Sequence, residues 1–203
     1  MCGRYYVDDD TAREIERLVR QVDEKLQKKA ASCRVEIAAK DIHPTEAAPI
    51  LVSSGSGLEC RWQRWGFPGF QKAQVIFNAR CESATEKPMF RDAVLHRRAV
   101  IPAAGFYEWD HRKQKHTFCR EGGKTLFMAG CYRKYEDGDR FVILTTQVNA
   151  SMEPVHDRMP LILEREEVVD WLLKDDATEE LLHRSPPLLE RRTEYEQMSI
   201  FHL

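Results

Sequence analysis

The fold is decided by three apolar runs in the second half of the chain, Thr117-Phe118-Cys119-Arg120, Leu126-Phe127-Met128-Ala129-Gly130-Cys131-Tyr132 and Phe141-Val142-Ile143-Leu144-Thr145-Thr146. Each run is short and rich in β-branched or aromatic residues, which is typical of strands. Gly122-Gly123 and Glu136-Asp137-Gly138-Asp139 separate the runs, and these residue types favour tight turns. The pattern predicts an antiparallel hairpin meander.

Similar apolar runs on both sides of this segment predict further strands. They are an N-terminal strand and the segments Ala48–Val52, Leu58–Trp65, Val75–Phe77, Arg97–Pro102, Phe106–Trp109, Met159–Leu163 and Tyr195–Phe201. Ala48–Val52 and Leu58–Trp65 flank Ser53-Ser54-Gly55-Ser56-Gly57, so we expect these two strands to form a hairpin.

Helices are predicted where apolar residues recur at every third or fourth position. Thr11–Glu14 has the form of a capping box, and the apolar face that follows is Ile15, Leu18, Val19, Val22 and Leu26. Residues 27–39 are charged and weakly patterned, which indicates a helix end and a loop. Ser83–Glu86 opens a short helix, and leucines around Trp171 and Leu181 mark two more. We therefore expect an α+β fold, with mostly antiparallel β-sheets forming an incomplete barrel-like core and with peripheral helices.

Length and composition indicate a globular protein with one domain over residues 1–203. Hydrophobic residues make up 42% and charged residues 32%, and no apolar run approaches the length of a membrane span. The N-terminus lacks the pattern of a signal peptide, so we expect a cytoplasmic protein. In that compartment the six cysteines are expected to be reduced.

Charge is distributed unevenly along the chain. The formal net charge is −2, which argues against a uniformly basic nucleic-acid binder. Residues 61–120, however, carry twelve Lys and Arg against five Asp and Glu, whereas residues 164–203 carry five against eleven. The middle segment can therefore offer a phosphate-binding face; a solvated mixed surface is the alternative.

The N-terminal sequence Met1-Cys2-Gly3-Arg4-Tyr5 carries a specific chemistry. Removal of Met1 leaves Cys2 with a free α-amine beside its thiol. Both groups reach their nucleophilic forms near neutral pH with modest help, and together they can close an aldehyde into a five-membered thiazolidine. The alternative is that Cys2 merely follows the start codon.

Standard cofactor and metal motifs are missing from the sequence. It contains no Walker A loop, no dinucleotide fingerprint, no H-E-x-x-H and no zinc-finger spacing, so we expect no cofactor and no metal. His111 and His116 are five residues apart in a predicted loop, which is weak support for a metal site. The remaining nucleophile constellation is a cysteine with a distant histidine and carboxylate.

Several polar and aromatic residues lie where a site could form. Asn78 follows a short strand, and Glu108 alternates with aromatic residues in another strand, where it is either solvated or placed in a cleft. Trp62 and Trp65 flank Arg64 and could stack on bases, or they could belong to the core.

Four motifs together resemble the SRAP (SOS response-associated peptidase) domain family. They are Met1-Cys2-Gly3-Arg4-Tyr5, Asn78-Ala79-Arg80-x-Glu82, Gly105-Phe106-Tyr107-Glu108-Trp109 and His156-Asp157-Arg158-Met159-Pro160, in the family's order and approximate spacing. The resemblance covers essentially the whole chain. It implies an abasic-site processing protein that crosslinks its N-terminal cysteine to the aldehyde of an abasic site in single-stranded DNA, as a thiazolidine that protects the lesion.

The resemblance also implies roles for single residues. Cys2 is the expected nucleophile, Asn78 orients the sugar-derived atoms, Glu108 lies near the amine, and His156 serves acid–base steps. Contacts to DNA are implied for Arg4 and Arg80 and, more loosely, for Trp62, Trp65, Lys87 and Thr145. Many family members read Asn-hydrophobic-Ala-Pro where this chain has Asp41-Ile42-His43-Pro44. An acidic group there would repel a phosphate, so the sequence places that loop outside the site.

Two other functions stay open at this point. The chain could be a cysteine peptidase in which Cys2 attacks an amide and His156 is the base, or a non-covalent module for single-stranded DNA. The expected partner is abasic single-stranded DNA, with association to the nucleoid when bound. We expect a monomer and no membrane partner, and the sequence identifies no protein partner.

Overall fold

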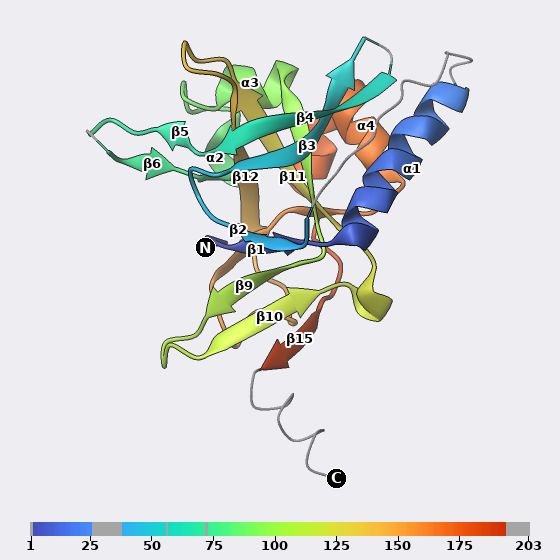
Figure 1. The fold of residues 1–203 in the computed structure, drawn as a ribbon. Coiled ribbons are helices and arrows are strands. Elements are labelled where there is room, and N and C mark those ends of the chain that lie inside the picture. Colours follow the sequence, from blue (N-terminus) through green and yellow to red (C-terminus); the bar gives the residue numbers. More distant parts are fainter. Residues whose placement is uncertain (1, 26–37, 56, 72, 194–203) are drawn as a thin grey trace.

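The computed structural model describes residues 2–25, 38–55, 57–71 and 73–193. One of its two larger sheets contains the N-terminal strand and lies below the other sheet in Figure 1. Its strands, in spatial order, are β15 (Glu190–Thr193), β10 (Lys115–Cys119), β9 (Gly105–Trp109), β1 (Tyr5–Val7) and β2 (Lys40–Ile42), and every neighbouring pair is antiparallel.

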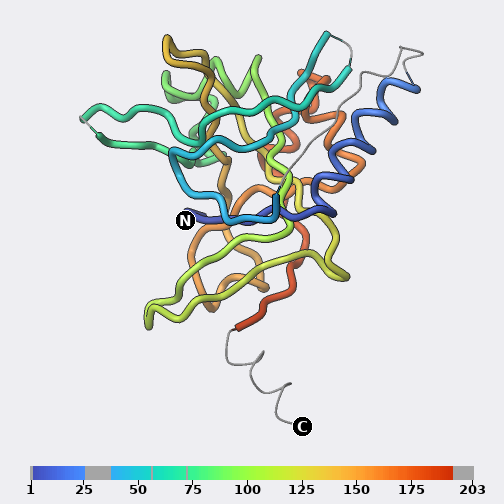
Figure 2. The backbone as a smooth tube through the Cα atoms, viewed as in Figure 1, coloured from blue at the N-terminus to red at the C-terminus, as the bar shows by residue number. Residues whose placement is uncertain are grey.

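The second sheet contains a closed ring of paired strands. The ring passes through β12 (Arg140–Gln147), β4 (Gly57–Trp65), β3 (Ala47–Ser54), β8 (Arg98–Ala103) and β11 (Leu126–Arg133), which returns to β12. Three short strands attach to it: β7 (Asn78–Arg80), β13 (Arg158–Pro160) and β14 (Ile162–Leu163). The hairpin of β5 (Phe67–Pro68) and β6 (Val75–Ile76) projects from the ring as an arm (Figure 2).

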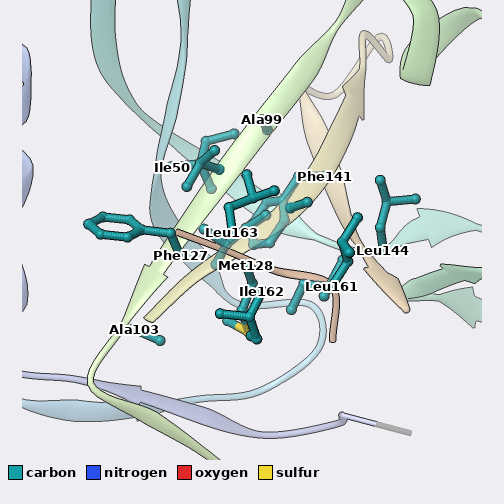
Figure 3. Close-up of a cluster of buried hydrophobic side chains, with 14 of the residues drawn as sticks. Ile50, Ala99, Ala103, Phe127, Met128, Phe141, Leu144, Leu161, Ile162 and Leu163 are labelled. Carbon is teal, nitrogen blue, oxygen red and sulfur yellow. The ribbon is translucent and has the colours of Figure 1, made fainter. Parts of the chain in front are cut away.

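The ring encloses the main hydrophobic core. Residues of β8 are buried along its whole length, as are those of β11 up to Tyr132, because the ring interior covers one face and helices contact the other. Figure 3 shows side chains from several ring strands meeting those of the segment that contains β14: Ile50, Ala99, Ala103, Phe127, Met128, Phe141, Leu144, Leu161, Ile162 and Leu163.

The helices lie outside the sheets. They are α1 (Asp9–Lys25), α2 (Cys81–Ala84), α3 (Arg91–His96), α4 (Glu167–Leu173), α5 (Thr178–Leu182) and a 3-10 turn at Glu121–Gly123. α1 packs on β4 and β8 through Ile15, Leu18 and Val19, as its apolar spacing predicts. No helix in the described ranges combines the length and the apolar character that crossing a bilayer requires. The α+β class with mostly antiparallel sheets is confirmed.

The predicted three-strand meander is only half correct. β11 and β12 form the expected hairpin, but β10 pairs with β9 and β15 and so belongs to the other sheet. Gly122 and Gly123 both have φ close to +70° and lie in the 3-10 turn that leads from one sheet to the other. The glycines therefore mark a change of sheet and not a hairpin.

Other element boundaries also differ from the sequence prediction. Asp8 caps α1, since its Oδ1 accepts hydrogen bonds from the Thr11 backbone N–H at 2.8 Å and from the hydroxyl at 2.7 Å, so the capping box at Thr11 is wrong. Ser83 lies inside α2 and does not begin a helix. His116 belongs to β10, not to a loop.

The predicted strand Met159–Leu163 is two strands separated at Leu161. The backbone of Leu161 bonds to Leu144 on one side and to Ala129 on the other, so the segment crosses from β12 to β11. The predicted strand over residues 195–201 lies outside the described residues, as do Leu26 and most of the predicted loop that follows it.

Candidate functional site

Cys2 lies three residues before the start of β1, and its side chain is fully buried. The Asn78 side-chain amide donates a hydrogen bond to the Cys2 carbonyl oxygen at 2.9 Å, across 76 residues of sequence. Asn78 Oδ1 is also buried and has no hydrogen-bond partner within the described residues. The structure therefore joins two of the four predicted catalytic residues and leaves one acceptor atom beside them.

Glu108 lies next to this pair on the neighbouring strand. Tyr5 of β1 pairs with Phe106 of β9. Two residues before Tyr5, the same register places Gly3 opposite Glu108. The Glu108 side chain is buried. Burial raises the pKa of the Cys2 thiol well above its ordinary value, and the negative charge of Glu108 raises it further. The Cys2 thiol is therefore protonated at neutral pH, and its attack on a carbon atom requires a base.

Strand β12 carries the other site segments on its two edges. β7 pairs with it through Ile143–Thr145, and β13 pairs with it through Thr145–Gln147. A two-fold ion pair joins these segments, because the two terminal nitrogens of Arg158 lie 2.7 and 2.8 Å from the Glu82 carboxylate oxygens. Arg158 also donates to the Thr145 carbonyl at 2.5 Å, so it fixes both motifs to β12.

His156 precedes β13 and is held by its own loop. Its Nδ1 accepts a hydrogen bond from the Arg158 backbone N–H at 3.0 Å and lies 2.7 Å from a carboxylate oxygen of Asp157. Nδ1 can accept the backbone bond only when it carries no proton, and it can donate to Asp157 only when it carries one. Because the Asp157 side chain is largely exposed, its contact is weak, and we assign Nδ1 as the acceptor of the backbone bond. A contact between His156 and Cys2 remains a prediction.

Arg4 is engaged by Asp41, a residue that the sequence places outside the site. Its Nε donates to Asp41 Oδ2 at 2.9 Å, and its terminal nitrogen contacts the same oxygen. The Tyr107 hydroxyl donates to the other Asp41 oxygen at 3.2 Å, and the Arg4 guanidinium lies 5.2 Å from the centre of the Tyr107 ring. Burial and the Asp41 carboxylate raise the pKa of Tyr107 to about 12. Asp41 therefore neutralises the charge of Arg4, a residue predicted to contact a phosphate.

The remaining predicted DNA contacts separate into exposed and buried residues. Arg80, Lys87 and Trp62 have exposed side chains, and Trp62 retains 50% of its accessible surface. Trp65 and Thr145 are fully buried; the indole N–H of Trp65 donates to the Phe77 carbonyl at 2.8 Å. Their burial favours the alternative that both side chains belong to the core, and a contact of either residue with DNA stays a prediction.

Sequence reasoning missed three residues that organise the site. Glu82 and Arg158 lie inside the recognised motifs, and their opposite charges were the available signal. The sequence places Asp41 outside the site because of its negative charge, and its pairing with Arg4, 37 residues away, leaves no local signal. Within the described ranges, no group of three or more His, Cys, Asp or Glu side chains could hold a metal ion. The five described cysteines are free thiols.

Comparison with known families gives a match over nearly the whole chain. The family model described as SOS response associated peptidase (SRAP) matches residues 1–200.

Individual relatives match over shorter segments. The abasic site processing protein YoaM of Bacillus subtilis is 33% identical over 146 residues, which cover 65% of this chain and 64% of the relative. The abasic site processing protein YedK of Escherichia coli is 30% identical over 124 residues, which cover 57% of this chain and 56% of the relative. The matched segment thus spans less than two thirds of the length of each of these relatives.

A solved structure of similar fold comes from Bacteroides thetaiotaomicron. It superposes with a TM-score of 0.73 over 95% of this chain and 91% of the other, at 23% sequence identity. At that identity the likeness concerns the fold alone.

Proposed function

The chain belongs to the SOS response associated peptidase (SRAP) family, and from this premise we propose that it processes abasic sites in single-stranded DNA by forming a covalent bond through Cys2. The observation that carries the proposal is the 2.9 Å bond from Asn78 to Cys2, with Glu108 on the adjacent strand. This arrangement supports a reactive N-terminus, because polar side chains from two distant segments converge on a buried Cys2.

The proposed reaction starts after Met1 has been removed. The α-amine nitrogen of Cys2 attacks the aldehyde carbon of the opened abasic sugar, and loss of water from the resulting carbinolamine gives an imine. The Cys2 sulfur then adds to the imine carbon, the thiol proton moves to the nitrogen, and a thiazolidine closes. One water molecule leaves, and no oxidant or reductant is consumed.

Three neighbouring residues have distinct roles in this proposal. Glu108 accepts a proton from the ammonium group and returns one to the departing hydroxyl, which its burial beside Cys2 supports. Asn78 Oδ1 accepts a hydrogen bond from a sugar hydroxyl, since it has no partner within the described residues. His156 supplies a second acid–base group, which protonates the ring oxygen when the sugar opens.

The DNA path in this proposal uses exposed cations and one aromatic residue. Arg80 ends β7, two residues after Asn78, and has no ion-pair partner within the described part of the chain. Lys87 and Trp62 are also exposed, and they suit a phosphate and an unpaired base respectively. Arg4 joins the path when its bond to Asp41 opens.

The test is a crosslinking reaction with a single-stranded oligonucleotide that contains one abasic site, resolved on a denaturing gel. We expect a covalent band with the wild-type protein and none with Cys2→Ala. Cys60→Ala is the matched control, because it removes a thiol that is partly buried and outside the site. Intact mass reports whether Met1 is absent.

Two other outcomes would contradict the proposal. Binding that salt reverses completely, with no covalent band, would indicate a non-covalent single-strand module. Cleavage of peptides that depends on Cys2, with no crosslink, would indicate the peptidase that the family description names.

A further inference from the structure

Glu108 faces a buried histidine on the strand next to it. His116 of β10 pairs directly with Glu108 of β9 in an antiparallel register, so the two side chains lie on the same face of the sheet. Side chains opposed in this way have Cβ atoms about 4.5–5.5 Å apart. The exposed fraction is 5% for Glu108 and 6% for His116. A carboxylate and an imidazole are thus buried side by side, one strand away from Cys2.

The neighbouring pair of residues on β9 and β10 is apolar. The next pair on the same face is Phe106 and Phe118, whose fully buried rings stack at 5.3 Å. An aliphatic or aromatic pair would continue this packing without the cost of desolvating two ionisable groups. The sheet therefore carries a polar pair at a position where core packing alone does not require one.

The hydrogen bonds of His116 define the states of its two nitrogens. Nε2 lies 3.4 Å from Asp110 Oδ2, and the other Asp110 oxygen accepts backbone N–H groups of Arg112 and Gln114, each at 2.9 Å. The backbone bond from Gln114 lowers the pKa of Asp110, so Asp110 is a carboxylate at neutral pH. A carboxylate accepts only, and we therefore assign the proton of the neutral imidazole to Nε2.

Nδ1 of His116 is left with a lone pair. This atom is buried and has no hydrogen-bond partner within the described residues. In the neutral ring Nδ1 can accept a proton, and in the charged ring it can donate one. The groups that share its face are Glu108 on β9, Thr193 directly opposite on β15, and Arg191 on β15, which is exposed and lies opposite Phe118. Asp110 follows β9 and faces Nε2, and Cys2 lies close enough to Glu108 that, besides burial, the charge of Glu108 raises the pKa of the thiol.

We propose that His116, oriented by Asp110, is a positioning residue that exchanges a proton with Glu108 through Nδ1 during the reaction of Cys2 with an aldehyde. This assignment rests on the proposed function. Glu108 receives the proton of the Cys2 ammonium group and passes it to Nδ1, and the imidazolium then lies between two carboxylates. The same proton returns through Glu108 to the hydroxyl that leaves as water, so the cycle has no net proton uptake by the protein.

The test compares His116→Gln with wild type in single-turnover crosslinking across pH 5 to 9. Glutamine keeps polar atoms in the strand but does not titrate. We expect an unchanged melting temperature and final yield, a rate lower by about tenfold, and a flattened pH profile. The expected loss is smaller than the roughly hundredfold or greater loss for a residue that itself transfers the proton. In a Glu108→Gln background the same change is expected to have no further effect on the rate.

Three results would overturn the assignment. They are a wild-type rate and pH profile in His116→Gln, an equal slowing in the Glu108→Gln background, and a slowing that merely follows a loss of folded protein. Asp110→Asn is the second variant, because Asp110 is less buried than Glu108 and His116. A wild-type pH profile in this variant would also contradict the proposed role of His116. Absence of any crosslink in the wild-type protein would refute the proposed function, and the role of His116 with it. A wild-type crosslink that ignores His116 would refute only the role of His116.

Discussion

Replacing Asp41 by asparagine should strengthen binding to single-stranded DNA. Asp41 holds Arg4 through Nε at 2.9 Å and through a terminal nitrogen, and it also accepts the Tyr107 hydroxyl. Asparagine keeps the shape and an oxygen that can accept the Tyr107 bond, but it removes the negative charge. Arg4 would then be available to a phosphate while the local fold stays intact.

The size of the effect follows from the exposure of the pair. The Arg4 and Asp41 side chains retain 32% and 30% of their accessible surface, so solvent screens their attraction. Ion pairs of this kind contribute about 0.2–1 kcal/mol. When Asp41 no longer competes with a phosphate for Arg4, the affinity for single-stranded DNA should therefore rise by about 1.5- to 5-fold. One additional phosphate contact should make the salt dependence steeper by about 0.7 units of slope for a single strand.

The assay is fluorescence anisotropy of a labelled single-stranded oligonucleotide without abasic sites, titrated at several salt concentrations. Asp170→Asn is the matched control, because it removes the same charge from an exposed pair between Asp170 of α4 and Lys174, which follows this helix. Arg4→Ala combined with Asp41→Asn completes a double-mutant cycle and should lose the gain.

Two results would refute this reasoning. One is an affinity and a salt slope in Asp41→Asn that equal those of wild type. The other is an equal gain in Asp170→Asn, which would assign the effect to net charge alone. A gain that persists after Arg4 has been removed would show that Asp41 acts on DNA directly and not through Arg4.

Three further predictions follow from the same contacts. Asp41→Asn should lower the pKa of Tyr107 from about 12 toward its ordinary value of 10.0, as ultraviolet titration of phenolate formation can check with Tyr107→Phe as the reference; stability linked to this raised pKa is complete below pH 10.0 and is lost as pH rises toward 12. Glu82→Gln should lower stability by about 1–2 kcal/mol, or about 2–8 °C in melting temperature, because Arg158 is buried and Glu82 is partly exposed. Hydrogen bonding from Arg158 lowers the pKa of Glu82, so this contribution is present above pH 4.5 and is lost as pH falls below it; equal acid unfolding of both proteins would contradict it. Trp62→Ala should weaken single-strand binding by about 1–3 kcal/mol with unchanged melting, whereas Trp65→Ala should destabilise the fold by about 3–5 kcal/mol; calorimetry and anisotropy on both variants would expose a reversed assignment.

The sequence by itself determined the local elements. Most strands and the helices α1, α4 and α5 were predicted because period-two and period-3.6 patterns depend on residues that are near each other in the chain. It also determined the candidate chemistry of the N-terminus, since an amine and a thiol on one residue need no distant partner. The motifs supplied Asn78, Glu108 and His156 as candidates, and the fold brings the first two to Cys2.

Only the tertiary structure decided which segments are neighbours. β10 pairs with β9 and not with β11, because both edges of β11 are occupied by β8 and by β12 and β14, and no local pattern reports these distant partners. Trp62 and Trp65 lie three residues apart in the same strand, and no local pattern distinguishes them. Trp62 is nevertheless exposed, whereas Trp65 forms part of the core. The pairing of Arg4 with Asp41 and of Glu108 with His116 arises from strand register, and register is fixed by the packing of the whole sheet. The ion pairing of Arg4 and the environment of Cys2 are therefore properties of the fold, because both depend on side chains that meet only when the sheet has formed.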